Sequence, residues 1–227
     1  MPNGTPYSAD PRERPLYSVY EAAHFIGRPP ATIRSWIKER TYPNGTVAQP
    51  IIKIPDEYDG RMSFNNLVEA HVLAALRRFH GVRMNAIRKA VAYAEHEMQV
   101  SNLLLRDELR TGLGEIFWET IFGYVNLSRS GQIAIRKIVE RYLSRVERDM
   151  SQLPMRLYPL IEAAPESRSV VIDPRVSFGQ PTVDGSGVPT AIIVQLIDAG
   201  EEVEGVAHEF DLDIKQVTDA IVYEQAA

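Results

Sequence analysis

The 227-residue sequence contains no cysteine, which excludes disulfide bonds, thiolate metal sites and cysteine nucleophiles. The sequence also lacks a long apolar run. No run of apolar residues approaches the roughly 18 residues that a membrane-spanning helix needs, so no membrane partner is expected. The first residues, 1–15, are polar and proline-rich without an apolar centre, which is unlike a secretory signal. Together these absences predict a cytoplasmic protein.

The motifs of common catalytic sites are absent as well. The five histidines are scattered, and the sequence contains no H-E-x-x-H zinc motif, Walker loop, dinucleotide fingerprint or G-x-S-x-G elbow. Glu95-His96-Glu97 is the densest group of possible metal ligands, but adjacent side chains on a helix point in different directions. We therefore expect no enzymatic activity, no metal ion and no cofactor.

Basic residues are scarce in the last quarter of the chain. Residues 170–227 hold two basic and eleven acidic side chains, a net charge of −9, so residues 1–169 carry +4 of the total of −5. A phosphate backbone responds to a local patch of charge rather than to the total. The first part of the chain can therefore attract nucleic acid, whereas the last part should repel it.

Two short helices are expected after a flexible tail at residues 1–16. Ser18 and Glu21 form a capping box for a helix that runs to Ile26 and stops at Gly27. A second helix starts at Arg28-Pro29-Pro30 and extends to about Arg40, with its buried face formed by Ile33, Trp36 and Ile37. This arrangement is typical of a helix-turn-helix, whose second helix enters the major groove. The residues expected to contact DNA are Arg28, Thr32, Arg34, Ser35 and Lys38.

The segment from Tyr42 to Phe64 changes from a helical to a β pattern. It has turn signals and a β-branched run at residues 51–54, and it predicts a hairpin whose second strand is Arg61 to Phe64. Such a hairpin would be the wing of a winged helix-turn-helix.

Two strings in this region resemble MerR-type regulators. They are Y-S-V-Y-E-A-A-H-F-I-G-R-P-P-A-T-I-R-S-W at residues 17–36 and G-R-M-S-F-N-N-L-V-E-A at residues 60–70. The resemblance covers residues 17–98 and implies that Arg34 and Arg61 occupy positions that contact DNA phosphates. The loop from Thr41 to Ile51 is longer than usual in that group. The alternative is that the helix pair is purely structural, with Arg34 only solvated.

The middle of the chain predicts further helices and a second hairpin. Helices are expected at residues 65–79 and 84–98, and a hairpin within residues 103–135 that pairs residues 116–118 with 124–127. An amphipathic helix at residues 133–150 has an apolar stripe that either forms a dimer interface or packs inside the monomer. Residues 153–169 read as a connector.

Two smaller features of this region also leave alternatives open. The pair Phe117-Trp118 either lines an effector pocket or packs in the core. The basic run of residues 77–89 is either a solvated helix end or a second phosphate contact.

The acidic C-terminal segment predicts a strand at residues 170–172, a glycine-rich structural loop at 178–187 and three helices at 190–199, 203–210 and 214–224. On the last helix, Lys215, Asp219 and Glu224 are expected to be exposed. The pattern I-D-P-x-x-x-x-G-x-P, with G-S-G-V-P-T further on, resembles a domain of VapB-type antitoxins, which are encoded beside PIN-like ribonuclease toxins. Its acidity either covers the basic surface of such a toxin or only keeps the domain soluble.

The expected fold is mainly α with small β-hairpins (α+β), divided into a tail (1–16), a winged helix-turn-helix (17–98), a middle region (99–169) and an acidic domain (170–227). The expected function is that of a homodimeric antitoxin that represses its own promoter, binds double-stranded DNA and neutralises a PIN-like ribonuclease by protein contact. The alternatives are a stand-alone regulator that senses a small molecule through residues 99–160, and an adaptor that does not bind DNA.

Overall fold

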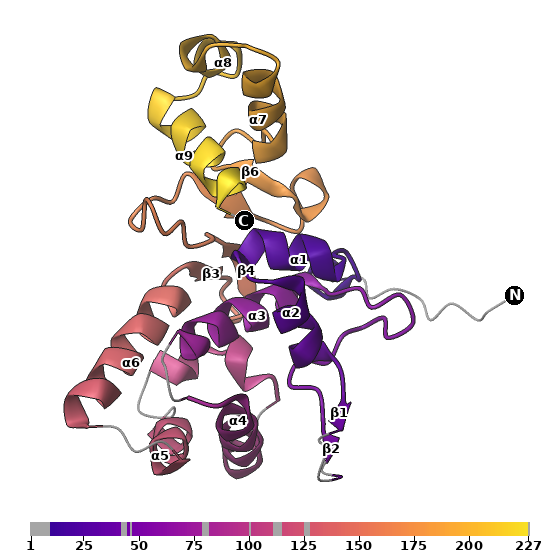
Figure 1. Cartoon of the computed structure of the whole chain (residues 1–227), viewed down its shortest axis with the longest axis vertical. Coiled ribbons are helices and arrows are strands. Elements are labelled where there is room, and N and C mark those ends of the chain that lie inside the picture. Colours follow the sequence, from indigo (N-terminus) through magenta and orange to yellow (C-terminus); the bar gives the residue numbers. More distant parts are fainter. Residues whose placement is uncertain are drawn as a thin grey trace, which may run out of the picture.

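The computed structural model describes residues 10–41, 45, 47–78, 82–99, 101–110, 115–124 and 128–226. Within these ranges the chain is mainly helical, with a two-stranded and a four-stranded antiparallel sheet, which confirms the predicted α+β class. The helices α7 to α9 form the upper end of the molecule, and α4, α5 and α6 lie at the opposite end (Figure 1). A short hairpin, β1–β2, projects on the same side as α4.

The N-terminal half is built around α3 (Phe64–Arg77), which is buried along almost its whole length. Around it lie α1 (Val19–Ile26), α2 (Pro30–Ile37) and α4 (Met84–Met98). The bounds of α1 and α4 match the predicted ones, whereas α2 ends at Ile37, three residues before the predicted end at Arg40. Ser63 caps α3 and forms a capping box with Asn66, so the helix starts at Phe64.

The prediction of a hairpin over residues 42–64 placed its strands at the wrong residues. The observed strands are β1 (Arg40–Thr41) and β2 (Val47–Ala48), and Phe64 is helical because of the capping box at Ser63. Residues 51–54 form no strand, since the N–H groups of Ile51 and Ile52 both donate to the carbonyl of Trp36. Arg61 and Met62 form only single bridges, to Asp56 and Tyr17.

The middle region departs further from the prediction. Residues 115–124 form α5 instead of a hairpin strand, because helical spacing places Phe117 and Ile121 together in the core; residues 125–127 lie outside the described part. The next helix, α6, spans Arg129–Leu143, with Ser128 as its N-cap, and stops before β3 (Val146–Arg148). The predicted helix over 133–150 therefore ends too late. The predicted connector at 153–169 contains β4 (Pro154–Leu157).

The apolar side chains of this region belong to the interior of a single chain. Ile135, Val139 and Leu143 of α6 are fully buried in the main core, and so is Phe117. Trp118 is also buried and donates from its indole nitrogen to the carbonyl of Leu109 at 3.1 Å. The α6 stripe thus packs inside the monomer, and the aromatic pair packs in the core.

Short helical turns complete the middle and the amino end: η1 (Pro11–Glu13), η2 (Leu103–Leu105) and η3 (Asp107–Arg110). The segment predicted as a loose tail is held in place from Asp10 onward. The Arg12 guanidinium pairs with Asp10 at 2.7 Å and with Asp149, in the turn between β3 and β4, at 2.6 Å. These pairs close a link between the start of the chain and the middle hairpin.

The C-terminal segment starts in the four-stranded sheet, whose order is β3-β4-β5-β6. Strands β5 (Val170–Ile172) and β6 (Pro181–Val183) flank the turn η5 (Ser177–Gly179). The helices α7 (Thr190–Asp198), α8 (Val203–Glu209) and α9 (Ile214–Gln225) confirm the three predicted helices. They enclose a small core of their own, whose buried members are Val183, Ile193, Val206, Ala207, Val217 and Ala220.

The last helix packs against the first. The hydroxyl of Tyr223 donates to the carbonyl of Phe25 at 3.1 Å, and Glu224 pairs with His24 at 2.7 Å. The prediction that Asp219 and Glu224 are exposed is wrong. Asp219 is buried against Ser167 and Ser169, and Glu224 faces α1. Lys215 is exposed, as predicted.

Candidate DNA interface

The pair α1–α2 has the local structure that its sequence predicts. The Ser18 hydroxyl accepts from the N–H of Glu21, and the Glu21 carboxylate accepts from the N–H of Ser18, which completes the capping box. Gly27 ends α1 with φ of 64°, a left-handed conformation that favours glycine. Pro30 lies in the first turn of α2, where its missing N–H costs nothing.

The inner face of α2 is fixed by Ile33, Trp36 and Ile37, which are all buried. The carbonyl of Trp36 accepts hydrogen bonds from Ile51 at 2.9 Å and from Ile52 at 3.1 Å. The segment that follows the β1–β2 hairpin is thereby attached to the end of α2. The hairpin and α2 therefore form one unit.

The outer face of α2 carries four of the predicted DNA contacts. Lys38 is exposed directly after the helix, and Thr32, Arg34 and Ser35 are half-buried. The Arg34 guanidinium lies over the ring of Tyr20 on α1, 4.9 Å from its centroid. An exposed cation–π contact of this kind contributes about 0.5–1 kcal/mol and directs the cation without removing it from solvent.

Arg28 and Arg61 lie apart from this group. The Arg28 guanidinium donates to the carbonyl of Ala74 at 3.4 Å and lines a cavity of about 220 Å³ between α1, α3 and the C-terminal helices. His71 lines the same cavity, and burial lowers its pKa to about 4, so it is neutral there. Arg61 is exposed next to the start of α1, where its guanidinium donates to the carbonyl of Leu16 at 3.1 Å.

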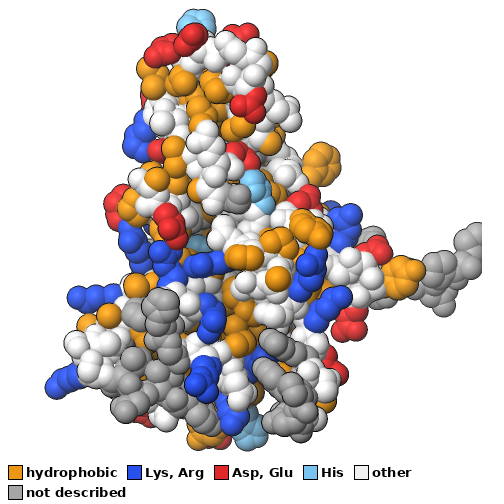
Figure 2. Space-filling view, viewed as in Figure 1, with side chains coloured by type: hydrophobic (Ala, Val, Ile, Leu, Met, Phe, Trp, Pro, Cys, Tyr) orange, Lys and Arg blue, Asp and Glu red, His pale blue; other side chains and the backbone are white. Residues whose placement is uncertain are grey.

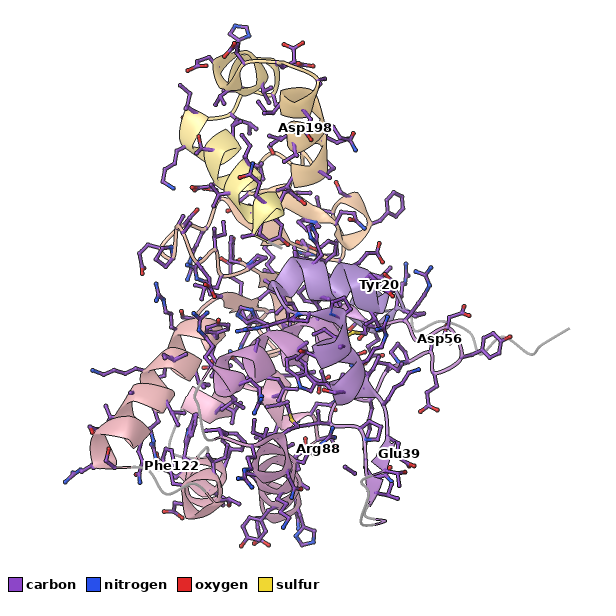
Figure 3. All side chains as sticks on the ribbon, in the orientation of Figure 1. Tyr20, Glu39, Asp56, Arg88, Phe122 and Asp198 are labelled. Atoms are coloured by element: carbon purple, nitrogen blue, oxygen red, sulfur yellow. The ribbon has the colours of Figure 1, made fainter. Side chains whose placement is uncertain are left out.

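Two residues that the sequence did not single out for this site shape it. Tyr20 is 65% exposed and supports Arg34. Arg88 of α4 donates to the carbonyl of Ser35 at 2.7 Å and also to the carbonyl of Gln49, so it joins α4 to α2 and to the hairpin. Figure 3 shows Arg88 in this position beside the hairpin, with Tyr20 on α1. The predicted basic run includes Arg88, but sequence spacing gives no signal for a contact with residue 35.

The opposite end of the molecule is acidic. Around α8 the exposed carboxylates are those of Asp198, Glu201, Glu202, Glu204, Glu209, Asp211 and Asp213. In Figure 2 acidic side chains gather at this upper end, whereas the blue lysine and arginine side chains concentrate on the lower part. The charge asymmetry of the sequence therefore becomes a spatial separation of charge.

The described residues lack both a membrane-spanning helix and a cluster of metal ligands. They contain no helix with both the length and the apolar character that crossing a bilayer requires. Nor do they bring three His, Cys, Asp or Glu side chains together in the way a metal ion needs.

Two families of known proteins match separate parts of the chain. Residues 15–91 match a family described as "Putative DNA-binding HTH domain", and residues 170–223 match one described as "Protein of unknown function (DUF433)". The chain is also 31% identical to the "Putative antitoxin VapB45" of Mycobacterium tuberculosis strain H37Rv, over 91% of this chain and 92% of that protein. The chain belongs to the VapB45 family.

Two further matches from the same organism also cover nearly the whole chain. The "Uncharacterized protein Rv2308" is 27% identical over 93% of this chain and 90% of its own length. The crystal structure of Rv2018 superposes with a TM-score of 0.69 at 29% identity, covering 91% of this chain and 97% of that one. The VapB45 relationship confirms the predicted antitoxin resemblance.

Proposed function

We propose that this VapB45-family chain is an antitoxin that binds the promoter of its own operon through α2 and the β1–β2 hairpin. The observation that carries the proposal is the outer face of α2, where Thr32 and Arg34 are partly exposed, the exposed Lys38 follows directly, and the helix contains no acidic residue. A recognition helix uses such a mixture of hydroxyl and basic groups to reach base edges and phosphates. The chain would act as a repressor in the cytoplasm, in the manner of MerR-like regulators.

The interface is centred on Arg34 and Lys38. Arg61 contributes a phosphate contact from its separate segment, although the preceding turn carries the carboxylates of Asp56, Glu57 and Asp59. Arg28 is not part of the proposed interface, because its guanidinium donates a hydrogen bond to the carbonyl of Ala74 inside the molecule. Operators with two-fold symmetry are read by two-fold proteins, so we propose that a homodimer binds.

A double variant tests DNA binding. Replacing Arg34 and Lys38 by alanine should weaken binding to the promoter fragment about a hundredfold and lower the slope of log K against log salt by about two. The measurement is a fluorescence anisotropy titration at several salt concentrations. The matched control replaces Arg129 and Lys137, two exposed residues on α6, by alanine; it removes the same charge at a distance from α2. Equal losses in both variants, or none in either, would refute this interface.

We further propose that the acidic end neutralises a PIN-like ribonuclease toxin by direct contact. Ribonucleases bind RNA through basic surface, and the exposed carboxylates around α8 are complementary to it. Coexpression with the product of the neighbouring gene should give a complex that survives size-exclusion chromatography. Reversing Glu201, Glu202 and Glu204 to lysine should dissociate that complex while promoter binding is retained; an intact complex would exclude this surface.

A further inference from the structure

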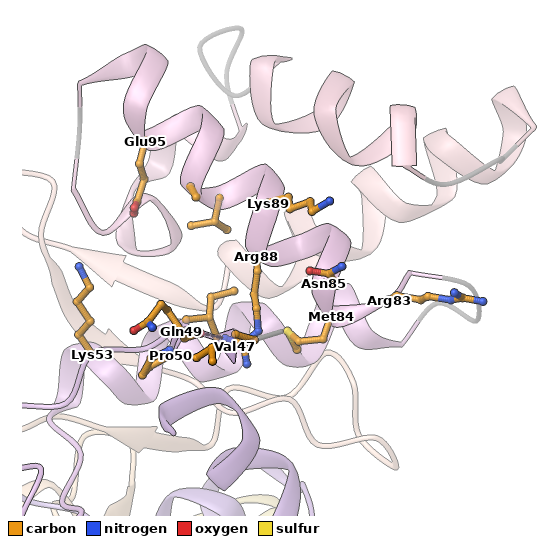
Figure 4. Close-up of a pocket in the computed structure, with 14 residues that line it drawn as sticks. Val47, Gln49, Pro50, Lys53, Arg83, Met84, Asn85, Arg88, Lys89 and Glu95 are labelled. Carbon is orange, nitrogen blue, oxygen red and sulfur yellow. Dashed lines mark hydrogen bonds between the residues drawn. The ribbon is translucent and has the colours of Figure 1, made fainter. Parts of the chain in front are cut away.

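A large groove separates the hairpin from α4. Its volume is about 880 Å³, and it lies between the segment of residues 47–53 and the outer side of α4 (Figure 4). Cavities that hold small organic ligands in proteins have volumes of about 300–1,000 Å³. The groove is thus large enough for a complete small molecule, and neither the fold nor the proposed DNA contacts account for it.

The walls of the groove are largely apolar. Val47 and Ile51 line one side, and Met84, Val91 and Ala92 line the other. Val47, on β2, is 47% exposed. A ligand that covered these side chains would remove their apolar surface from water.

The charges around the groove are predominantly positive. Lys53, Arg83, Arg88 and Lys89 line it, and Glu95 is the acidic residue among the lining side chains. The Glu95 carboxylate accepts a hydrogen bond from the N–H of Leu103 at 2.8 Å, so Glu95 is held toward Leu103, and the four basic side chains outnumber its one negative charge. Figure 4 shows Lys53 rising from the hairpin side toward α4, with Arg88 reaching down from α4 to the strand segment.

Lys53 is exposed and forms no ion pair with any carboxylate in the described part of the chain, although its charge opposes the rise in pKa that burial causes in the Glu69 carboxyl. An ammonium group at the edge of an apolar groove attracts an anion, and the apolar wall holds whatever is attached to that anion. This combination selects against neutral and cationic molecules. It also selects against a fully polar anion, which would gain nothing from the apolar side chains.

We propose that the groove binds a small organic anion, with its acidic group at Lys53 and its apolar body against Val47, Ile51 and Met84. The groove shares the β1–β2 hairpin with the proposed DNA interface. Its ligand contacts, Lys53 and the outer side of α4, are different residues from the proposed DNA contacts Arg34, Lys38 and Arg61, so anion binding can be tested without DNA.

The test uses two probes of nearly the same shape. One is 8-anilinonaphthalene-1-sulfonate, an apolar aromatic anion, and the other is N-phenyl-1-naphthylamine, which has the same rings without the sulfonate. Both fluoresce when they leave water, so Kd follows from fluorescence titration of the full chain. The sulfonate should bind the unchanged protein about tenfold more tightly than the neutral probe, since a charge-assisted contact distinguishes them.

Two groove variants locate the site. Lys53→Glu should weaken binding of the sulfonate about tenfold while leaving the neutral probe unchanged, and Ala92→Glu should weaken binding of both probes by adding bulk and charge to the apolar wall. The control is Lys137→Glu, which makes the same charge reversal on α6. Thermal unfolding of each variant checks that the fold is kept; all three positions are exposed. Groove variants that bind the sulfonate as tightly as the control does would overturn the proposal.

Discussion

Replacing Trp36 by alanine should lower the free energy of unfolding by about 3–5 kcal/mol, the usual cost of removing a buried aromatic ring. Trp36 is 1% exposed and is among the largest fully buried side chains of the protein. The surrounding core cannot close over a cavity of that size without moving α2. Because the carbonyl of the same residue holds Ile51 and Ile52, the hairpin should be displaced as well.

Urea denaturation followed by circular dichroism measures this loss directly, and Tyr20→Ala provides the control. Tyr20 lies on the neighbouring helix and is 65% exposed, so its removal should cost less than about 1 kcal/mol. If the two variants had similar midpoints, Trp36 would not be the residue that anchors α2.

Replacing Glu69 by glutamine should stabilise the protein above neutral pH. Glu69 lies on α3 and is only 5% exposed. Burial raises the pKa of its carboxyl from an ordinary 4.5 to about 7, while the side chain of Asn66, which donates to it at 3.0 Å, opposes this rise. Ionising this group in the folded protein is therefore costly.

The pH dependence of this effect has a definite sign. Below pH 4.5 the carboxyl is protonated in both the folded and the unfolded chain, and Glu69 costs nothing. Between pH 4.5 and about 7 the unfolded chain releases the proton first, so stability falls as the pH rises, by about 3 kcal/mol in total. Glutamine cannot ionise and avoids this loss.

Chemical denaturation at pH 8 and at pH 4.5 therefore distinguishes Glu69→Gln from the unchanged protein. The variant should be more stable by about 3 kcal/mol at the higher pH and nearly equal at the lower one. Glu204→Gln, at an exposed position of α8, should show no such difference. A gain that was the same at both pH values would mean that ionisation of Glu69 is not its cause.

The helices that sequence alone located best are those with local start and stop signals. The Ser18 and Glu21 capping box predicted α1, and the predicted helix at residues 214–224 agrees with α9, which begins at a capping box formed by Asp213 and Gln216. Both signals act within one turn of the backbone, so no tertiary information is needed. The class of fold and the helix-turn-helix followed from the same kind of local evidence.

The errors arose where distant contacts decide the local structure. The apolar run near Phe117 is compatible with either a strand or a helix, and its packing against α4 decides for the helix. Residues 51–54 have a strand-like composition but donate to the end of α2 instead of pairing with another strand. Hydrophobic periodicity carries no information about such partners.

The candidate interface shows the same division. Thr32, Arg34 and Ser35 lie on one short helix and Lys38 follows it directly, so their nearness in sequence places them in one region. Arg28 lies just before that helix, yet its guanidinium turns toward Ala74, 46 residues further along the chain. The hydrogen bond from the Arg88 guanidinium to the carbonyl of Ser35 likewise joins residues 53 positions apart in the sequence.

The docking of the last helix on the first has a consequence for synthesis of the protein. A ribosome releases His24 and Phe25 about two hundred residues before it releases Tyr223 and Glu224, which cover them. The helix pair thus leaves the exit tunnel with one side uncovered, and α9 can cover that side only after about two hundred further residues have been synthesised. A nascent chain that stalls before Tyr223 should present an unfinished amino-terminal surface to chaperones and proteases.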